Sequence, residues 1–232
     1  MINLRRSEER GPSRLSWLDS RHTFSFGGYY DPAHMGVSVL RVLNDDSVIP
    51  GGGFATHSHQ DMEIISYVLS GVIEHKDSMG NIERLPAGEF QLMSAGTGVT
   101  HSEYNPSATD GLRFLQIWIR PNELGVQPGY QQKRFPPVDG RQLVISPDGR
   151  DGTLSIKQDA FVEYIRLAAG EALPVGADNG RVQYLHVIDG RLEVDDANLE
   201  GGDGGTIFDE VVELRCIDEC EALLFDLPGR DE

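Results

Sequence analysis

The chain has 232 residues, of which 37 are acidic and 20 are basic, so its formal charge is −17 at pH 7. Because a phosphate backbone is bound through lysine and arginine, this balance excludes direct binding to nucleic acid and disfavours anionic membrane surfaces. The hydrophobic fraction of 39% and the charged fraction of 25% are those of a folded globular protein. The charge is uneven, at −4 over residues 1–120 and −13 over residues 121–232, whereas six of the seven histidines lie in the first half.

The first eight residues carry a basic pair but no apolar stretch after it, which argues against a signal peptide. The chain has no run of 18 apolar residues, the length that a membrane-spanning helix requires. We therefore expect a cytoplasmic protein.

Strand patterns dominate the rest of the chain. Residues 63–69 form a β-rich run that ends at Ser70 and Gly71, and a second run follows at 72–75. In residues 112–119 apolar side chains occupy both alternating sets, as expected for a strand that is buried on both faces. Because the chain offers few helical patterns and many glycine-rich turns, we predict an all-β fold with few short helices.

The chemistry is concentrated between residues 51 and 105. His57 and His59 form a His-x-His pair, and His101 and Glu103 form a His-x-Glu pair some 40 residues later. Residues i and i+2 of a strand point to the same face, so two such pairs on neighbouring strands would bring three imidazoles and one carboxylate to one point. This ligand set suits iron, manganese, nickel, cobalt, copper or zinc better than magnesium or calcium. Taken alone, each pair is also compatible with an exposed strand without a metal.

A weak internal repeat connects the two halves. Residues 67–74 resemble residues 186–193 at an offset of 119 residues, which is about half of the chain. Two similar β-domains would explain this, although eight residues of strand, turn and strand can also agree by chance. Between the halves, residues 121–151 are rich in proline, glycine and glutamine and are typical of a connector.

Several motifs resemble those of the pirin family, within the cupin superfamily of small β-barrels. The cupin-like motifs are Gly51-x5-His57-x-His59-x3-Glu63 and Gly98-x2-His101-x3-Asn105, with Glu103 in place of Glu63 as the ligand. The pirin-like segments are residues 17–26, 30–32, 77–81 and 94–98. The resemblance implies a bicupin, with an N-terminal metal-binding barrel in residues 1–120, a connector in 121–150 and a C-terminal barrel without metal in 151–232.

The resemblance also implies a ligand set and an activity. The metal ligands would be His57, His59, His101 and Glu103, holding one divalent ion, with Fe(2+) as the first expectation. The expected activity is that of a quercetin 2,3-dioxygenase, in which a flavonol and O2 react with release of carbon monoxide and Glu103 acts as ligand and general base. The alternative is a non-enzymatic, redox-responsive iron protein that acts through a protein partner; a metal-dependent isomerase or sugar-binding cupin is a third reading. We expect a monomer.

Other residues carry narrower expectations. Glu63 is expected near the metal as a supporting carboxylate, and Phe54 and Met93 are expected in an aromatic-binding pocket. His22 is a candidate for the neighbourhood of the site, with a structural role favoured. At the repeat offset, His57 and His59 correspond to Gly176 and Asp178, so we expect His186 to be a strand histidine without a metal. Cys216 and Cys220 are expected to be reduced structural thiols.

Overall fold

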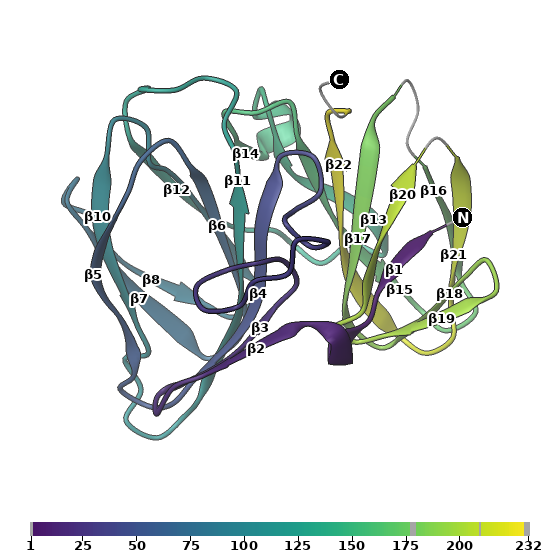
Figure 1. Ribbon diagram of the computed structural model, residues 1–232, viewed down its shortest axis with the longest axis horizontal. Coiled ribbons are helices and arrows are strands. Elements are labelled where there is room, and N and C mark those ends of the chain that lie inside the picture. The colour runs from purple at the N-terminus through teal and green to yellow at the C-terminus, as the bar shows by residue number, and fades with distance from the viewer. Residues whose placement is uncertain (1, 177–179, 209, 230–232) are drawn as a thin grey trace.

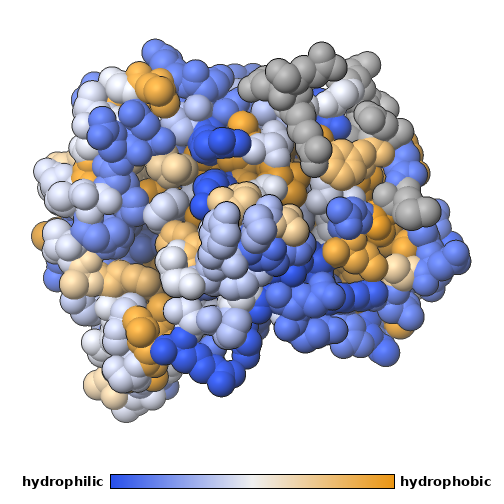
Figure 2. All heavy atoms as spheres, in the orientation of Figure 1, coloured by the Kyte–Doolittle hydropathy of each residue, from blue (hydrophilic) through white to orange (hydrophobic). Residues whose placement is uncertain are grey.

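The computed structural model describes residues 2–176, 180–208 and 210–229, and it consists of two β-barrels side by side (Figure 1). The prediction of an all-β bicupin with few helices is confirmed. The described residues contain two 3-10 helices, η1 (Ser7–Glu9) and η2 (Arg150–Gly152). No helix in these parts of the chain has the length and hydrophobicity needed to cross a membrane. The face in Figure 2 is mostly hydrophilic, with apolar residues interspersed in smaller groups.

The N-terminal barrel is built from a seven-stranded and a four-stranded antiparallel sheet. In spatial order, the seven strands are β12 (Gly129–Arg134), β9 (Glu89–Ser94), β6 (Glu63–Ser70), β11 (Leu112–Ile119), β4 (Leu40–Val48), β3 (Leu18–His22) and β2 (Gly11–Arg14). The four strands are β5 (Gly53–His59), β10 (Val99–Tyr104), β7 (Val72–Asp77) and β8 (Ile82–Pro86).

The C-terminal barrel repeats this division into seven and four strands. The larger sheet has the order β1 (Asn3–Arg5), β20 (Gly204–Phe208), β17 (Val182–Asp189), β22 (Cys220–Leu227), β15 (Phe161–Leu167), β13 (Gly140–Ser146) and β14 (Leu154–Ser155). The smaller sheet has the order β16 (Ala172–Gly176), β21 (Val211–Cys216), β18 (Arg191–Val194) and β19 (Ala197–Glu200).

Strand pairing crosses the predicted domain limits at both ends of the N-terminal barrel. The predicted connector contains two strands, of which β12 pairs with β9 of the first barrel and β13 pairs with β15 of the second. The strand β1, at the start of the chain, pairs with β20 of the second barrel. The division into 1–120, 121–150 and 151–232 stays a prediction, but each barrel takes strands from outside its assigned range.

The repeated segments occupy matching places in the two barrels. Each forms a strand of the large sheet, a glycine turn and a strand of the small sheet, namely β6 to β7 and β17 to β18. Gly71 and Gly190 both adopt positive φ, at 82° and 80°. A Cβ atom at either position would lie within 2.7 Å of a backbone carbonyl oxygen, that of Gly111 or of Glu219, so both turns require glycine.

The two large sheets face each other and share one hydrophobic core. On β11, Leu115, Ile117 and Ile119 enter this inter-barrel core, while Phe114 and Gln116 alternate with them and face the inside of the first barrel. The prediction of a strand buried on both faces is therefore confirmed for β11.

The inside of the second barrel is filled by apolar side chains. This core includes Leu185, Leu192 and Leu214 together with the two cysteines, which are both free and buried as expected. The metal-site equivalents deduced from the repeat cannot be compared in full, because Asp178 lies outside the described residues.

His186 is a buried strand histidine of β17, as predicted, and it lies where the two barrels meet. Its side chain is 1% exposed, and burial, reinforced by the positive charge of Arg10, lowers the pKa of the imidazole to about 3. Asp45 and Arg113 of the first barrel also act on it electrostatically. The folded protein therefore keeps this imidazole neutral at pH values where the unfolded chain would protonate it.

This burial predicts a contribution of His186 to acid instability. Between its unfolded pKa of 6.5 and about 3, only the unfolded state binds the proton, so stability falls as the pH drops through this range. From pH 7 to pH 5 the loss should be about 2 kcal/mol. Urea unfolding at both pH values should show a smaller loss for His186→Gln than for wild type, with His34→Gln, at a part-exposed position, measured as the control. An unchanged pH dependence in His186→Gln would contradict the assignment.

Candidate metal centre

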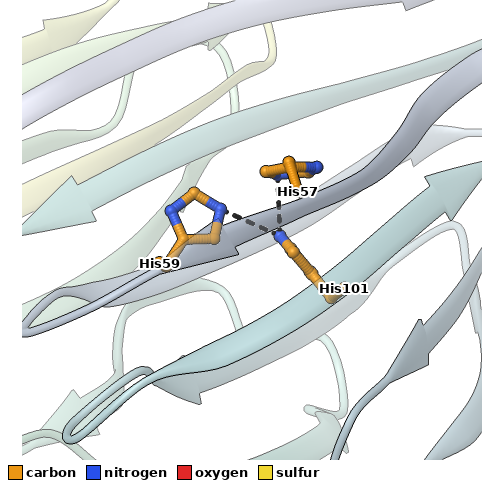
Figure 3. A group of neighbouring side chains, drawn as sticks. All are labelled: His57, His59 and His101. Atoms are coloured by element: carbon orange, nitrogen blue, oxygen red, sulfur yellow. Dashed lines mark hydrogen bonds between the residues drawn. The ribbon is translucent and has the colours of Figure 1, made fainter.

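Three histidines converge inside the first barrel because two adjacent strands present them to the same face. β5 carries His57 and His59 two residues apart, and β10 pairs with β5 so that His101 lies opposite His57. The Nε2 atom of His101 lies 3.0 Å from the Nε2 atom of His57 and 3.0 Å from that of His59. The rings of His57 and His59 both point toward the ring of His101 (Figure 3).

The spacing and protonation of these nitrogens fit a bound cation. Two nitrogens about 2.1 Å from one ion and at right angles to each other lie about 3.0 Å apart, whereas a tetrahedral angle would separate them by about 3.4 Å. Burial, reinforced by the neighbouring imidazoles, lowers the pKa of His59 to about 4 and that of His101 to about 3. These two rings are therefore neutral at pH 7, and each can offer a nitrogen lone pair to a metal ion.

The third imidazole, His57, is oriented by the backbone. Nδ1 of His57 lies 2.8 Å from the carbonyl oxygen of Ala55, so a proton on Nδ1 would leave Nε2 free to bind a metal.

Glu103 lies two residues beyond His101 on β10 and is held by two polar neighbours. The side chain is 3% exposed, its Oε2 accepts a hydrogen bond of 2.9 Å from Gln116, and its Oε1 accepts one of 3.3 Å from Ser66. Burial raises the pKa of its carboxyl group, although the nearby His75 and His57 oppose that shift. The four predicted ligands thus fall into two overlapping groups that share His101, and Glu103 belongs to the group without His57 and His59.

The other member of Glu103's group is His75, which the sequence analysis did not propose as a site residue. One ligand atom each from His75, His101 and Glu103 lie within 4.8 Å of one another. Nε2 of His75 lies 3.0 Å from Oδ2 of Asp77, and both side chains are fully buried. Asp77 is fixed in turn by the side-chain amide of Asn81 at 2.8 Å. The sequence does contain a signal for His75, because His75 and Asp77 are two residues apart on β7, as are the members of the two predicted ligand pairs.

A cavity of about 350 Å³ opens onto this centre. Its wall includes three of the proposed ligands, His57, His59 and Glu103. Asn44, Asp46 and Gln116 add further polar side chains, and Ala55 also lines it. Four aromatic side chains make the rest of the wall: Trp17, Phe26, Phe54 and Trp118. Trp17 meets Phe54 edge to face at 4.9 Å between ring centroids, and Phe26 meets Trp118 in the same way at 5.2 Å. The cavity therefore suits a flat aromatic molecule with polar groups at one end.

The narrower expectations had mixed outcomes. Phe54 lines the cavity, but Met93 does not, because it is fully buried in a small core with Ile64 and Val99. His22 is buried and bonds Asn44 through Nδ1 at 2.7 Å, so it supports a cavity residue instead of reaching the cavity. The carboxylate of Glu63 accepts hydrogen bonds from Ser94 and from the backbone N–H of Lys157, so it connects the two barrels.

The shared position of His101 predicts its effect on metal content. We expect His101→Ala to lose stoichiometric metal, because its Nε2 lies 3.0 Å from both other imidazoles. Asp77→Asn should lower metal affinity by less than His101→Ala does, because Asp77 orients His75, which packs beside His101 and is not a proposed ligand. Metal analysis after nickel reconstitution would measure both effects, with the part-exposed His34→Ala as control. One equivalent of tightly bound metal in His101→Ala would rule out the three-histidine centre.

Comparison with known proteins identifies a family for each of the two barrels. Residues 3–119 match the Pirin family model, and residues 143–227 match the model for the quercetinase C-terminal cupin domain. The chain is 50% identical over 229 residues to the quercetin 2,3-dioxygenase of Escherichia coli K12, covering 98% of this chain and 99% of the relative. It is 40% identical over 233 residues to a pirin-like protein of Caulobacter vibrioides, covering 97% and 99%. The crystal structure of the bacterial pirin YhhW of E. coli in complex with nickel(II) superposes with a TM-score of 0.96 at 50% identity, covering 99% of this chain and 100% of that one. The chain belongs to the pirin family of bicupin proteins.

Proposed function

We propose that this pirin is a metal-dependent dioxygenase that opens the central ring of flavonols such as quercetin with O2 and releases carbon monoxide. The observation that carries the proposal is the cavity of about 350 Å³ in which four aromatic side chains meet the histidine and carboxylate centre. The names of the E. coli relative and the nickel(II) complex of the related pirin support the same reaction class.

The proposed ligands are His57, His59, His101 and Glu103, and Fe(2+) is the proposed ion among the divalent metals that this donor set accepts. When bound, the ion supplies a Lewis acid for an oxygen anion of the substrate. The neutral state of His59 and His101 at pH 7 keeps two of the three imidazoles available without competition from protons.

Glu103 is the proposed acceptor for the proton of the flavonol 3-hydroxyl. Its burial raises the pKa of the carboxyl group, so the carboxylate is a stronger base than an exposed glutamate. The hydrogen bonds from Gln116 and Ser66 fix its orientation. Loss of the hydroxyl proton leaves the flavonol as an electron-rich anion, which is the form that reacts with O2.

The aromatic walls position the flat rings of the substrate by stacking and edge contacts. Trp118 adds a polar handle, because its buried Nε1 has no hydrogen-bond partner among the residues that the structure describes. Oδ1 of Asp46, also buried, has none within the same part of the chain. Burial raises the pKa of Asp46 to about 7, so its protonated form can donate a hydrogen bond to a substrate oxygen.

The role of Glu103 predicts a loss of rate. Glu103→Gln keeps the size of the side chain but removes the base, so we expect kcat for quercetin to fall by about 10²-fold to 10⁴-fold. Anaerobically purified protein should be tested for metal content, quercetin consumption and carbon monoxide, with Arg215→Gln at the surface as control. Wild-type turnover by metal-loaded Glu103→Gln would contradict this role.

The aromatic wall predicts an effect on substrate binding. Phe54→Leu should raise KM for quercetin about threefold to tenfold with a smaller change in kcat, because an aromatic contact is lost and the base stays in place. Phe161→Leu is the matched control, since Phe161 packs against Arg150 and Arg181 and lies outside this cavity. Equal KM values for Phe54→Leu and wild type would exclude this wall from the substrate site.

The same assays separate the enzyme from the non-enzymatic alternative. Metal-loaded wild-type protein that consumes no flavonol and releases no carbon monoxide would overturn the dioxygenase proposal. A redox-responsive protein that acts through a partner would then be the better description.

A further inference from the structure

A second and larger cavity, of about 440 Å³, lies between the two barrels. Its wall takes Tyr67 and Phe90 from the large sheet of the first barrel and Val144, Tyr164 and Ile188 from that of the second. None of these residues belongs to the metal-site cavity. Interfaces between domains are frequent positions for small-molecule sites, and the volume is within the range of such sites.

One side of this inter-barrel cavity is an aromatic wall. The rings of Tyr67 and Phe90 stack at 4.2 Å with an angle of 19° between their planes. Phe135 meets Phe90 at 5.9 Å, and Tyr164 meets Tyr67 at 5.8 Å, both at steep angles. Phe135 and Tyr164 are only partly buried, so the wall offers apolar surface to a planar ring.

Three arginines surround this wall in a protein whose formal charge is −17. Arg113 binds Asp45 through Nε and Nη2, and Arg166 pairs with Glu219 at 2.7 Å. Arg134 bonds the carbonyl oxygen of Ala87 through Nη2 and pairs with Glu89 through Nε at 3.3 Å. A guanidinium group has five N–H donors, and these contacts occupy only one or two of them at each arginine. The side chains remain 35% to 55% exposed, so their remaining donors can reach a ligand.

Two acidic residues also line the cavity, and each lies beside a positive or hydrogen-bonding group. Asp189 acts on Arg113 electrostatically, and Glu221 faces Arg166 across the strands β22 and β15. Glu221 also bonds the hydroxyl of Tyr164. The lining itself therefore carries three positive and two negative groups, and each arginine also has a carboxylate partner outside the lining, namely Asp45, Glu89 or Glu219. Lys133, whose Nζ lies 4.9 Å from the Phe135 ring centroid, adds a further positive charge nearby.

We propose that this cavity is a second ligand site, separate from the metal centre, which binds a planar aromatic carboxylate. The ring would pack on the partly exposed rings of Phe135 and Tyr164, and the carboxylate would accept hydrogen bonds from the free donors of Arg134 and Arg166. Charge-assisted bonds to a planar guanidinium favour a carboxylate over an uncharged group.

The test uses 2-naphthoate as probe and 2-naphthalenemethanol as its uncharged counterpart, with the metal-loaded protein in an isothermal titration at low ionic strength. We expect saturable binding of one naphthoate per chain and at least about tenfold weaker binding of the alcohol. Arg134→Gln and Phe135→Leu should each weaken naphthoate binding by about tenfold. Arg215→Gln should bind as wild type, because Arg215 has the same side-chain exposure of 55% as Arg134 but lies outside the cavity.

Three outcomes would overturn the proposal. One is the absence of saturable naphthoate binding, and another is equal binding of the acid and the alcohol. The third is binding that His101→Ala abolishes and Arg134→Gln leaves unchanged, which would place the probe at the metal centre. Unfolding curves for each variant distinguish a lost contact from a damaged fold, and an Arg166→Gln variant gives a second reading if Arg134→Gln is unstable.

Discussion

Burial of the strands β4, β6 and β11 on both faces is the constraint on which the two barrels and the metal centre depend. Side chains alternate along a strand, so each of these strands must supply one set to the inter-barrel core and another to the inside of the first barrel. On β11 the first set is apolar, whereas the second includes Gln116, which holds Glu103. A shift of one residue in register would exchange the two sets and place Gln116 in the apolar core.

The same alternation on β4 places charged groups on opposite sides of one strand. Asn44 and Asp46 face the metal-site cavity, while Asp45 points the other way and pairs with Arg113 at 2.8 Å. The hydrogen bonds and positive charge of Arg113 hold the pKa of Asp45 below its usual value even though burial opposes this. Asp46 has no arginine partner within the described part of the chain, and burial raises its pKa even though a hydrogen bond with Ser20 opposes the shift. Neighbouring aspartates thus differ in protonation because the strand directs them to different surroundings.

The uneven charge of the sequence also has a structural counterpart. The near-neutral half forms most of the barrel whose interior holds the histidines and carboxylates, and that interior is kept polar by paired hydrogen bonds such as those of Glu103. The acidic half forms most of a barrel whose interior is an apolar core. Its acidic residues are mostly on the surface, where several pair with arginines, as Asp218 does with Arg191. These surface pairs are solvated and contribute little to stability.

The sequence by itself determined the all-β fold, the two halves and the residues of the two ligand pairs, because strand alternation and glycine turns are local properties. The tertiary structure decided which of these side chains come together in space. It placed His101 between His57 and His59, added His75 and Asp77 from β7, and brought Trp17 and Phe26 to the cavity from segments distant in the chain. It also made the inter-barrel cavity, whose lining comes from strands of both barrels. The physical reason is that strand order and the packing of two sheets are set by contacts between residues far apart in sequence, and these contacts leave no periodic pattern within either segment.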